Sequence, residues 1–499
     1  MPQAPDSEAA SNWFDLLSRR VRSGVDWLTE TLVLPPQSTP TTWQRAIRWA
    51  WMGGVYLLVL VVWITFMNWG RIPFGVHDWL QEWGFDTTLQ QSLTQGVLPL
   101  HTSSITFGTD RFLAIPQTIL SPQTLLLRFV NLGTFLVIHT VLLATIGFVG
   151  CLALIKYLRI SPLAGGLLFL LVALNGQLVA QVAVGHVMWL GIFILPFYFL
   201  LLLRLLDGQA GARWPLAMAF TLFFLLLQGS THLYTWCLLF LGLVWVIERK
   251  HRRTLFEAGL LSGLLGAFRL IPAGLAFSEI NPISYPGYPS LGHVIAGLVF
   301  PLPPSEQLWL TTSAGWWEFD MYLGVLGLGF VAAFALLLPM GHQQAARRTI
   351  YIAAGVMALF ALGYLYLPLR ELPIPLISHE RVPSRFLAVP LLAMVILAVE
   401  GFQGWLDRVR PGGGARFVML ILLLVLVQDL VQHARIWRLE LVAQALPMQA
   451  LDTGLHIANR PDPAYTSVLA ISAVVSLAAL GYGLIRVWRG QTGPKPRPG

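Results

Sequence analysis

Three carboxylates, Asp78, Glu82 and Asp86, stand within nine residues just after the first long apolar stretch of the sequence. Their spacing of four residues predicts that they share one face if this segment is helical. Carboxylates at a lipid–water boundary can serve as a general base or hold a divalent cation. The acidic cluster is therefore a candidate for either role, with Glu82 and Asp86 as supporting acids beside Asp78. A Mg²⁺ or Mn²⁺ ion at Asp78 and Glu82 stays open, as does a merely solvated acidic loop.

Three arginines could supply the complementary positive charge. Arg269 stands inside an apolar stretch, where a guanidinium is costly and by default indicates a function. Arg381 and Arg385 stand together at the start of another apolar stretch. The planar fork of Arg269 would suit a pair of phosphate oxygens, and Arg381 and Arg385 could clamp an anionic headgroup or a pyrophosphate. The alternatives are an internal salt bridge for Arg269, and interfacial side chains with an internal ion pair for the other two.

Further polar side chains stand at the ends of other apolar stretches. A lone histidine in such a place is more often a packed, hydrogen-bonded residue than a catalyst, but two of them end neighbouring stretches. None has a metal-ligand spacing such as HxxxH, which argues against a zinc site. We expect the following side chains to line one pocket with the acids and arginines: His186, His232, Glu318, Tyr322, His379 and Glu380.

The amino-acid composition predicts the type of secondary structure that holds these residues in place. Of the 499 residues, 56% are apolar and only 11% are charged, and the mean hydropathy is +0.67. Soluble domains carry about 25% charged residues, so this chain cannot cover a water-facing surface. A soluble enzyme, a disordered chain and a fibrous repeat are excluded. Since the apolar stretches are long and continuous, the sequence predicts an all-α polytopic membrane protein.

Twelve apolar stretches are candidates for transmembrane helices, and eleven or thirteen are alternatives. They fall at about 49–70, 127–155, 161–180, 187–206, 214–229, 233–247, 256–277, 321–339, 350–368, 386–402, 416–431 and 466–486. Residues 1–48 then form an N-terminal segment with an amphipathic helix or a loose tail. Residues 49–487 form the transmembrane domain, and 488–499 a disordered tail. The first outer loop, 71–126, is long and is expected to hold interfacial or re-entrant helices.

The basic residues predict the orientation. Most of the 32 Lys and Arg residues fall between the stretches that an N-terminus in the cytoplasm would place inside. Both termini are therefore expected in the cytoplasm, in a multi-pass protein of the cell inner (cytoplasmic) membrane. The net charge of +8 is explained by this topology, and no nucleic-acid partner is needed. Cys151 and Cys237 lie in apolar stretches and are expected to be inert.

The sequence lacks the motifs of proteins that use nucleotides or a catalytic triad. The sequence shows no phosphate-binding P-loop, no nucleotide fingerprint and no Ser-His-Asp signature. Any reaction must then draw its energy from the substrate itself. A sugar already activated as a polyprenyl phosphate meets that need on the outer face of the membrane.

These motifs, in this order, resemble the GT-C superfamily of integral-membrane glycosyltransferases, in particular its bacterial multi-span branch. The resemblance covers about residues 49–402. It rests on HDW around Asp78, QSLTQGVLPL, PQTILSPQTLL, GHVMW followed by ILP, FRLIP, WEFDMYLG and RVPSRF. The sequence departs from the pattern at His101, where tryptophan is usual, and at FGTDRFLAIP.

The resemblance implies a GT-C fold and an inverting sugar transfer with Asp78 as general base. The donor would be a polyprenyl-phosphate sugar, held at its phosphate by Arg269, Arg381 and Arg385. The acceptor would be a glycan, a lipid or a protein, and membrane lipid would surround the site. Two alternatives stay open, a twelve-span transporter or flippase and a non-catalytic subunit of a membrane assembly. Two similar halves would favour the transporter, and stable partners would favour the subunit.

Overall fold

The computed structural model describes residues 23–24, 26–33, 40–106, 108–277, 285–305, 315–338, 344–371, 380–447 and 455–492. Regular structure in these ranges is almost entirely helical, which confirms the predicted class. The one sheet described is a hairpin of β1 (His101–Thr106) and β2 (Thr109–Arg111). His379 and most of the predicted amphipathic segment lie outside the described residues, but 23–24 and 26–33 are helical.

Within the residues that the structure describes, seven helices are long and apolar enough to cross a bilayer. An eighth span would result if two bent helical segments are counted as one. The first is α9 (Thr231–Ile247), and the second is Arg249–Leu265, which includes α10 (Arg252–Leu265). The chain bends by 115° between them. The seven are α2 (Thr42–Phe66), α4 (Leu132–Leu158), Pro162–Ala183, Val187–Leu206, Pro383–Val409, α17 (Gly413–Ile436) and Pro463–Trp488. These apolar helices fit a membrane protein. The count of about twelve spans stays a prediction.

Each of the twelve predicted stretches falls on helical structure, but several are short. The 14 residues of α8 (Trp214–Leu227) rise only about 21 Å, less than the roughly 30 Å of a bilayer core. Proline and glycine shorten others, as in α11 (Ala267–Phe277), which contains Pro272. The remaining helices are α12 (Leu291–Val299), α13 (Gly324–Val331), which continues as η8 (Ala332–Leu337), α14 (Gln344–Phe360), α15 (Gly363–Arg370) and α18 (Leu439–Ala445).

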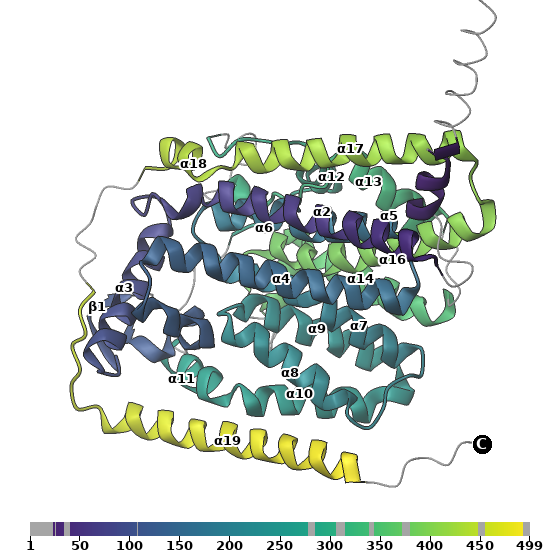
Figure 1. Cartoon of the computed structure of the whole chain (residues 1–499). Helices are drawn as coiled ribbons and strands as arrows, with labels where there is room; N and C mark the ends of the chain where they lie inside the picture. Colours follow the sequence, from purple (N-terminus) through teal and green to yellow (C-terminus); the bar gives the residue numbers. More distant parts are fainter. Residues whose placement is uncertain are drawn as a thin grey trace, which may run out of the picture.

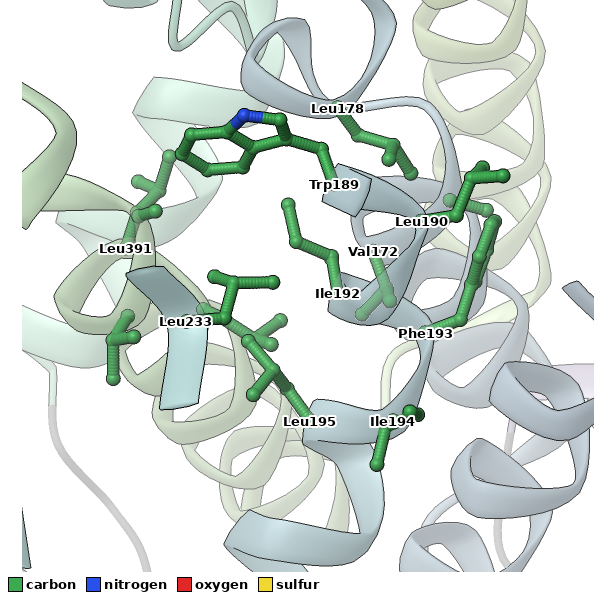
Figure 2. Close-up of a cluster of buried hydrophobic side chains, with 14 of the residues drawn as sticks. Val172, Leu178, Trp189, Leu190, Ile192, Phe193, Ile194, Leu195, Leu233 and Leu391 are labelled. Carbon is green, nitrogen blue, oxygen red and sulfur yellow. The ribbon is translucent and has the colours of Figure 1, made fainter. Parts of the chain in front are cut away.

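The core is built around α5 (Pro162–Ala173) and α6 (Gly176–Ala183), the span whose apolar window is wholly buried. Next to it run η5 (Val187–Ile194), which continues as α7 (Leu195–Leu206), and the helices α2, α4 and α16 (Ala388–Val409). Figure 2 shows how their side chains interlock, with Trp189 above Ile192 and Leu391 facing them from α16. Cys151 and Cys237 are buried and unbonded, as expected of packing residues. The span of α5 and α6 therefore has no apolar face left for lipid, whereas the outer helices keep one.

Two helices lie at the periphery of the bundle. In Figure 1, α17 runs along one edge and α19 (Pro463–Thr492) along the opposite edge. Only 22% of the apolar window of α17 and 17% of that of α19 is buried. Their apolar side chains point outward, as expected for helices that face hydrocarbon. Because α19 continues to Thr492, the tail predicted from residue 488 begins with helix, and residues from 493 lie outside the described part.

One end of the bundle carries a cap of shorter elements (Figure 1). The segment between α2 and α4 folds into α3 (Trp79–Gln95), the β1–β2 hairpin, and the 3₁₀ turns η2 (Phe112–Ala114), η3 (Thr118–Leu120) and η4 (Pro122–Arg128). Residues 455–462 run beside β1, where Ser103 N donates to His456 O at 2.9 Å and Ala458 N donates to His101 O at 2.9 Å. The first and last predicted outer loops therefore meet at this end.

Candidate functional site

Asp78 lies at the first residue before α3, directly above the end of α6. Its backbone N–H donates to Val184 O at 3.1 Å, and the Trp79 indole donates to Ala183 O at 3.0 Å. Trp79 is fully buried, so it anchors the start of α3 on the core. The Asp78 side chain does not cap its own helix. The Asp78 carboxylate therefore points instead toward the segment after α6 that holds His186.

Gly185 makes this close approach possible. It has a φ of +101°, which an L-residue with a side chain rarely adopts. A Cβ atom at this position would lie 2.3 Å from Trp79 N. His77, immediately before Asp78, also has a positive φ of 38° and packs edge-on against Trp317, with ring centroids 4.6 Å apart. Glycine and a strained histidine thus fix the relative positions of Asp78 and His186.

A chain of hydrogen bonds connects Asp78 with Arg385 through three other buried or half-buried side chains. His186 Nε2 lies 2.6 Å from Asp78 Oδ2, and His186 Nδ1 contacts Gln181 Oε1. Gln181 Nε2 donates to Glu318 Oε2 at 3.0 Å. The Arg385 guanidinium donates to both Glu318 carboxylate oxygens, at 2.6 and 2.5 Å. We call these five residues, Asp78, His186, Gln181, Glu318 and Arg385, the Asp78 network.

The two ring nitrogens of His186 both face oxygen atoms. The Gln181 amide nitrogen faces two acceptors, Glu318 Oε2 and Trp317 O, each at 3.0 Å, so its oxygen must face His186. The other ring nitrogen faces the Asp78 carboxylate. His186 is thus held between an amide oxygen and a carboxylate oxygen. Acidic and basic side chains alternate along the Asp78 network, with the neutral Gln181 amide between His186 and Glu318.

The carboxylates of the Asp78 network stay ionised. Burial by itself would raise the pKa of Asp78, but the hydrogen bond and charge of His186 outweigh it and lower the pKa to about 2. In the same way, Arg385 outweighs burial at Glu318 and lowers its pKa to about 2. The Asp78 side chain is 32% exposed, whereas the Glu318 and Arg385 side chains are 8% and 3% exposed. Asp78 is therefore the end of the network that an external molecule can reach.

The other two predicted acids lie farther along α3 and do not join Asp78. Glu82 and Asp86 are each 2% exposed, and one carboxylate oxygen of each has no hydrogen-bond partner. Burial, together with the negative charges of Asp86 and Asp78, raises the pKa of Glu82 well above its ordinary value. Burial raises the pKa of Asp86 to about 7. The helical prediction for this segment is confirmed, but these two acids face the protein interior, where burial favours their neutral forms.

A second cluster surrounds Glu380. Its carboxylate accepts from the Trp236 indole at 3.0 Å and lies 3.1 Å from His232 Nδ1. Burial opposes ionisation of Glu380, but the charge and hydrogen bond of His232 lower its pKa. Because Arg385 and Arg381 follow Glu380 in the chain, this cluster lies beside the Asp78 network. Arg381 is exposed, and its charge contributes to the low pKa of Asp78.

The other predicted site residues, Arg269 and Tyr322, have partners outside the Asp78 network. Arg269 is 4% exposed, and it donates to the backbone oxygens of Leu113 and Gln117 at 3.3 and 2.5 Å. Within the described ranges no carboxylate lies at ion-pair distance from Arg269, so it fastens the capping segment to α11. The Tyr322 hydroxyl donates to Asp429 Oδ1 at 2.6 Å, and its ring stacks on His433. Tyr322 thus belongs to a contact with α17.

His77, Asp78 and His186 offer ligand atoms within 4.8 Å of one another. This is the one group of that kind in the part of the chain that the structure describes. Both nitrogens of His186 already face oxygen atoms of Gln181 and Asp78, and Mg²⁺ prefers oxygen ligands to imidazole. The chemistry that this group suits is that of a carboxylate held by hydrogen bonds. Glu82 is not one of its members, so the Mg²⁺ or Mn²⁺ ion suggested at Asp78 and Glu82 stays a prediction.

The sequence did not single out Gln181. A glutamine inside the apolar stretch NGQLVAQVAV was the available signal, because a buried amide must find partners. Comparisons with known proteins add no assignment: no family model matches the chain, and no curated protein or solved structure matches it significantly.

Proposed function

We propose that this protein is a membrane glycosyltransferase that moves a sugar from a polyprenyl-phosphate carrier to an acceptor hydroxyl. The observation that carries the proposal is the state of Asp78. It is a partly exposed carboxylate, kept ionised by His186 at one end of an apolar helix bundle, with the exposed Arg381 nearby. The carboxylate suits the hydroxyl of an acceptor, and the positive charge suits the phosphate of a donor, at the same end of the bundle.

The reaction needs one base and one leaving group. The acceptor oxygen forms a bond to the anomeric carbon, the bond from that carbon to the phosphate oxygen breaks, and polyprenyl phosphate leaves with the electron pair. The configuration inverts, and Asp78 takes the hydroxyl proton. Since the transition state resembles an oxocarbenium ion, the hydroxyl becomes acidic as the new bond forms. A weak base such as Asp78 can then accept its proton late in the reaction.

The phosphate would bind through the arginine that is exposed at the surface, Arg381. Arg385 uses two donors on Glu318, and Arg269 uses two on backbone carbonyls, and both are buried. We therefore assign the phosphate contact to Arg381 first, and give Arg269 and Arg385 positioning roles. Positive charge there would stabilise the negative charge that develops on the leaving phosphate.

The membrane and orientation belong to the proposal as well. We propose the cytoplasmic membrane of the cell, with both termini inside and the capped end outside. The basic residues at the opposite end of α2 and α4, among them Arg45, Arg48, Lys156 and Arg159, support this orientation.

A non-catalytic role in a membrane assembly is the second candidate. It is favoured by the engagement of Arg269 and Arg385 within the protein, which leaves fewer free cations for a phosphate. The two candidates differ in what cells accumulate. Mass spectrometry of lipid extracts and glycans from cells with and without the gene tests this. We expect a polyprenyl-phosphate sugar to accumulate, and one sugar to be missing from a glycan, when the gene is deleted. Unchanged extracts and glycans would favour the second candidate.

A further inference from the structure

A cavity of about 1050 Å³ lies at the end of the bundle opposite Asp78. Its walls are the first turns of α2, the last turns of α4 and α16, and the turn that enters α5. Asp78 follows the other end of α2, which at 25 residues is about 37 Å long. The cavity is therefore about one bilayer thickness away from the Asp78 network. Pockets for small ligands measure about 300–1,000 Å³, so this one has room for a lipid headgroup and parts of its chains.

The polar side of the cavity carries an excess of positive charge. Four cations line it, Arg45, Arg48, Lys156 and Arg159. Lys156 and Arg159 are exposed, and the described part of the chain offers neither of them an ion-pair partner. Two acids also line the cavity, but Glu400 is already held by Arg347 through bonds of 2.8 and 3.0 Å. Asp407 is the only carboxylate of the lining outside such a pair, so the site attracts an anion.

The other walls of the cavity are apolar. Met52, Leu152 and Ile155 line it below the cations. Met52 is seven residues after Arg45 on α2, which places it about 10 Å deeper along the helix axis. An exposed tryptophan, Trp49, stands between these levels, as aromatic side chains do at membrane boundaries. A free inorganic anion would leave these apolar walls without a partner, whereas a lipid would cover them.

We propose that this cavity binds one anionic phospholipid of the surrounding bilayer. Its phosphate lies against Arg45, Lys156 and Arg159, and its acyl chains cover Met52 and Leu152. Bound in this way, the lipid connects the start of α2 with the ends of α4 and α16. Basic pockets between transmembrane helices suit anionic headgroups on charge alone, and the apolar walls make this one specific for a lipid.

The test uses the purified full-length protein in neutral detergent, with phosphatidylglycerol or phosphatidylcholine added. Native mass spectrometry counts retained lipids, and thermal denaturation reports the stabilisation. We expect one phosphatidylglycerol to remain bound and to raise the melting temperature, and phosphatidylcholine to do neither. The double variant Lys156→Gln with Arg159→Gln should bind phosphatidylglycerol at least about tenfold more weakly. The reason is that each Lys or Arg near an anionic lipid headgroup strengthens binding by about tenfold or less, and two are removed.

The chain offers a matched control. Arg410 ends α16 in the same left-handed conformation as Arg159 ends α4, with φ values of 45° and 55°. Arg408 stands near it, as Lys156 does near Arg159, but neither Arg408 nor Arg410 lines the cavity. The control double variant Arg408→Gln with Arg410→Gln should therefore keep the affinity of the unaltered protein.

Three results would overturn the proposal. The first is undiminished phosphatidylglycerol binding in the cavity variant, and the second is an equal loss in the control, which would indicate a general attraction to a basic surface. The third is the same stabilisation by inorganic phosphate alone, which would make the site one for a soluble anion. If the double variant does not fold, the single change Arg45→Gln at an exposed position serves instead. None of these measurements depends on sugar transfer, so they test the cavity separately from the proposed function.

Discussion

Asp78 and His186 are 108 residues apart in the sequence, and their side chains are 2.6 Å apart. The hydrogen bond and the charge of His186 lower the pKa of Asp78, and the contact holds its carboxylate in one orientation. Gln181, Glu318 and Arg385 continue the arrangement into the core, so the position of Asp78 depends on three segments of the chain. This pairing is the basis of the proposed chemistry, and each part of it can be tested.

Replacing His186 should change the pH dependence of transfer. In His186→Phe the hydrogen bond and positive charge are lost while burial remains, so the pKa of Asp78 rises from about 2. Protonation then removes the base at a higher pH than in the unaltered protein. We expect the acid limb of the activity profile in membrane vesicles to move up by about one to two pH units. An unmoved acid limb would show that His186 does not set the state of Asp78.

Gly185 should be far more sensitive to substitution than other glycines with positive φ. Gly185→Ala places a Cβ 2.3 Å from Trp79 N, so α3 must move away from α6. Gly208, with a φ of +72°, has no atom within 4 Å of such a Cβ and serves as the control. Gly208→Ala should cost only about 1–2 kcal/mol of backbone strain. Gly185→Ala should lower the melting temperature further and abolish transfer. Equal effects of the two substitutions would contradict the proposed close approach.

The Glu318–Arg385 pair should behave as a coupled unit. Removing either partner leaves a buried charge uncompensated, which typically costs about 3–5 kcal/mol. Glu318→Leu and Arg385→Leu should each destabilise the protein by about that amount. The loss of unfolding free energy in the double variant should be smaller than the sum of the losses in the two single variants. Unfolding in a denaturing detergent measures the three free energies, and strict additivity would mean that the pair is not coupled.

Asp86 should make the stability of the protein depend on pH. Its pKa is about 7 in the folded protein and about 4 when unfolded, so the folded state holds an extra proton in between. Stability from this group is therefore complete at low pH and is lost as the pH rises through 7. Asp86→Asn removes this pH dependence. Between pH 5 and pH 8 the free energy of unfolding of the variant should therefore fall by about 1–3 kcal/mol less than that of the unaltered protein. Melting temperatures at these two pH values measure it. Asp110→Asn, which alters a carboxylate ion-paired with Arg460, is the control; the same pH response in both variants would count against the assignment.

Hydrophobic patterning predicted the helices well, because a long apolar run in a chain with few charges has little choice but to be helical in lipid. It predicted their lengths less well. Breaks such as Pro272 in α11, and the 115° bend after α9, depend on packing that apolarity does not encode. The tail expected from residue 488 likewise begins with the end of α19.

The candidate site could be predicted one residue at a time, but not as a network. Asp78, His186, Glu318 and Arg385 were each singled out by type and place, and the structure brings them together. Their connection through Gln181 could not be foreseen, since it depends on the left-handed turn at Gly185. Equal spacing on one helix suggested that Glu82 and Asp86 would join Asp78. They do not, because Asp78 precedes the helix and turns to His186, whereas the other two face the interior.

The role of Asp78 is the central claim, and complementation of a deletion strain tests it most directly. Cells that lack the gene receive the unaltered protein, Asp78→Asn, or Asp110→Asn, a carboxylate in the same capping segment. Protein levels in the membrane are matched, and mass spectrometry of lipid extracts measures the polyprenyl-phosphate sugar. Because a general base typically contributes about 10²–10⁴-fold, the account predicts that Asp78→Asn leaves the sugar lipid as high as in the deletion. Asp110→Asn should restore the normal level. Full restoration by Asp78→Asn would contradict the account.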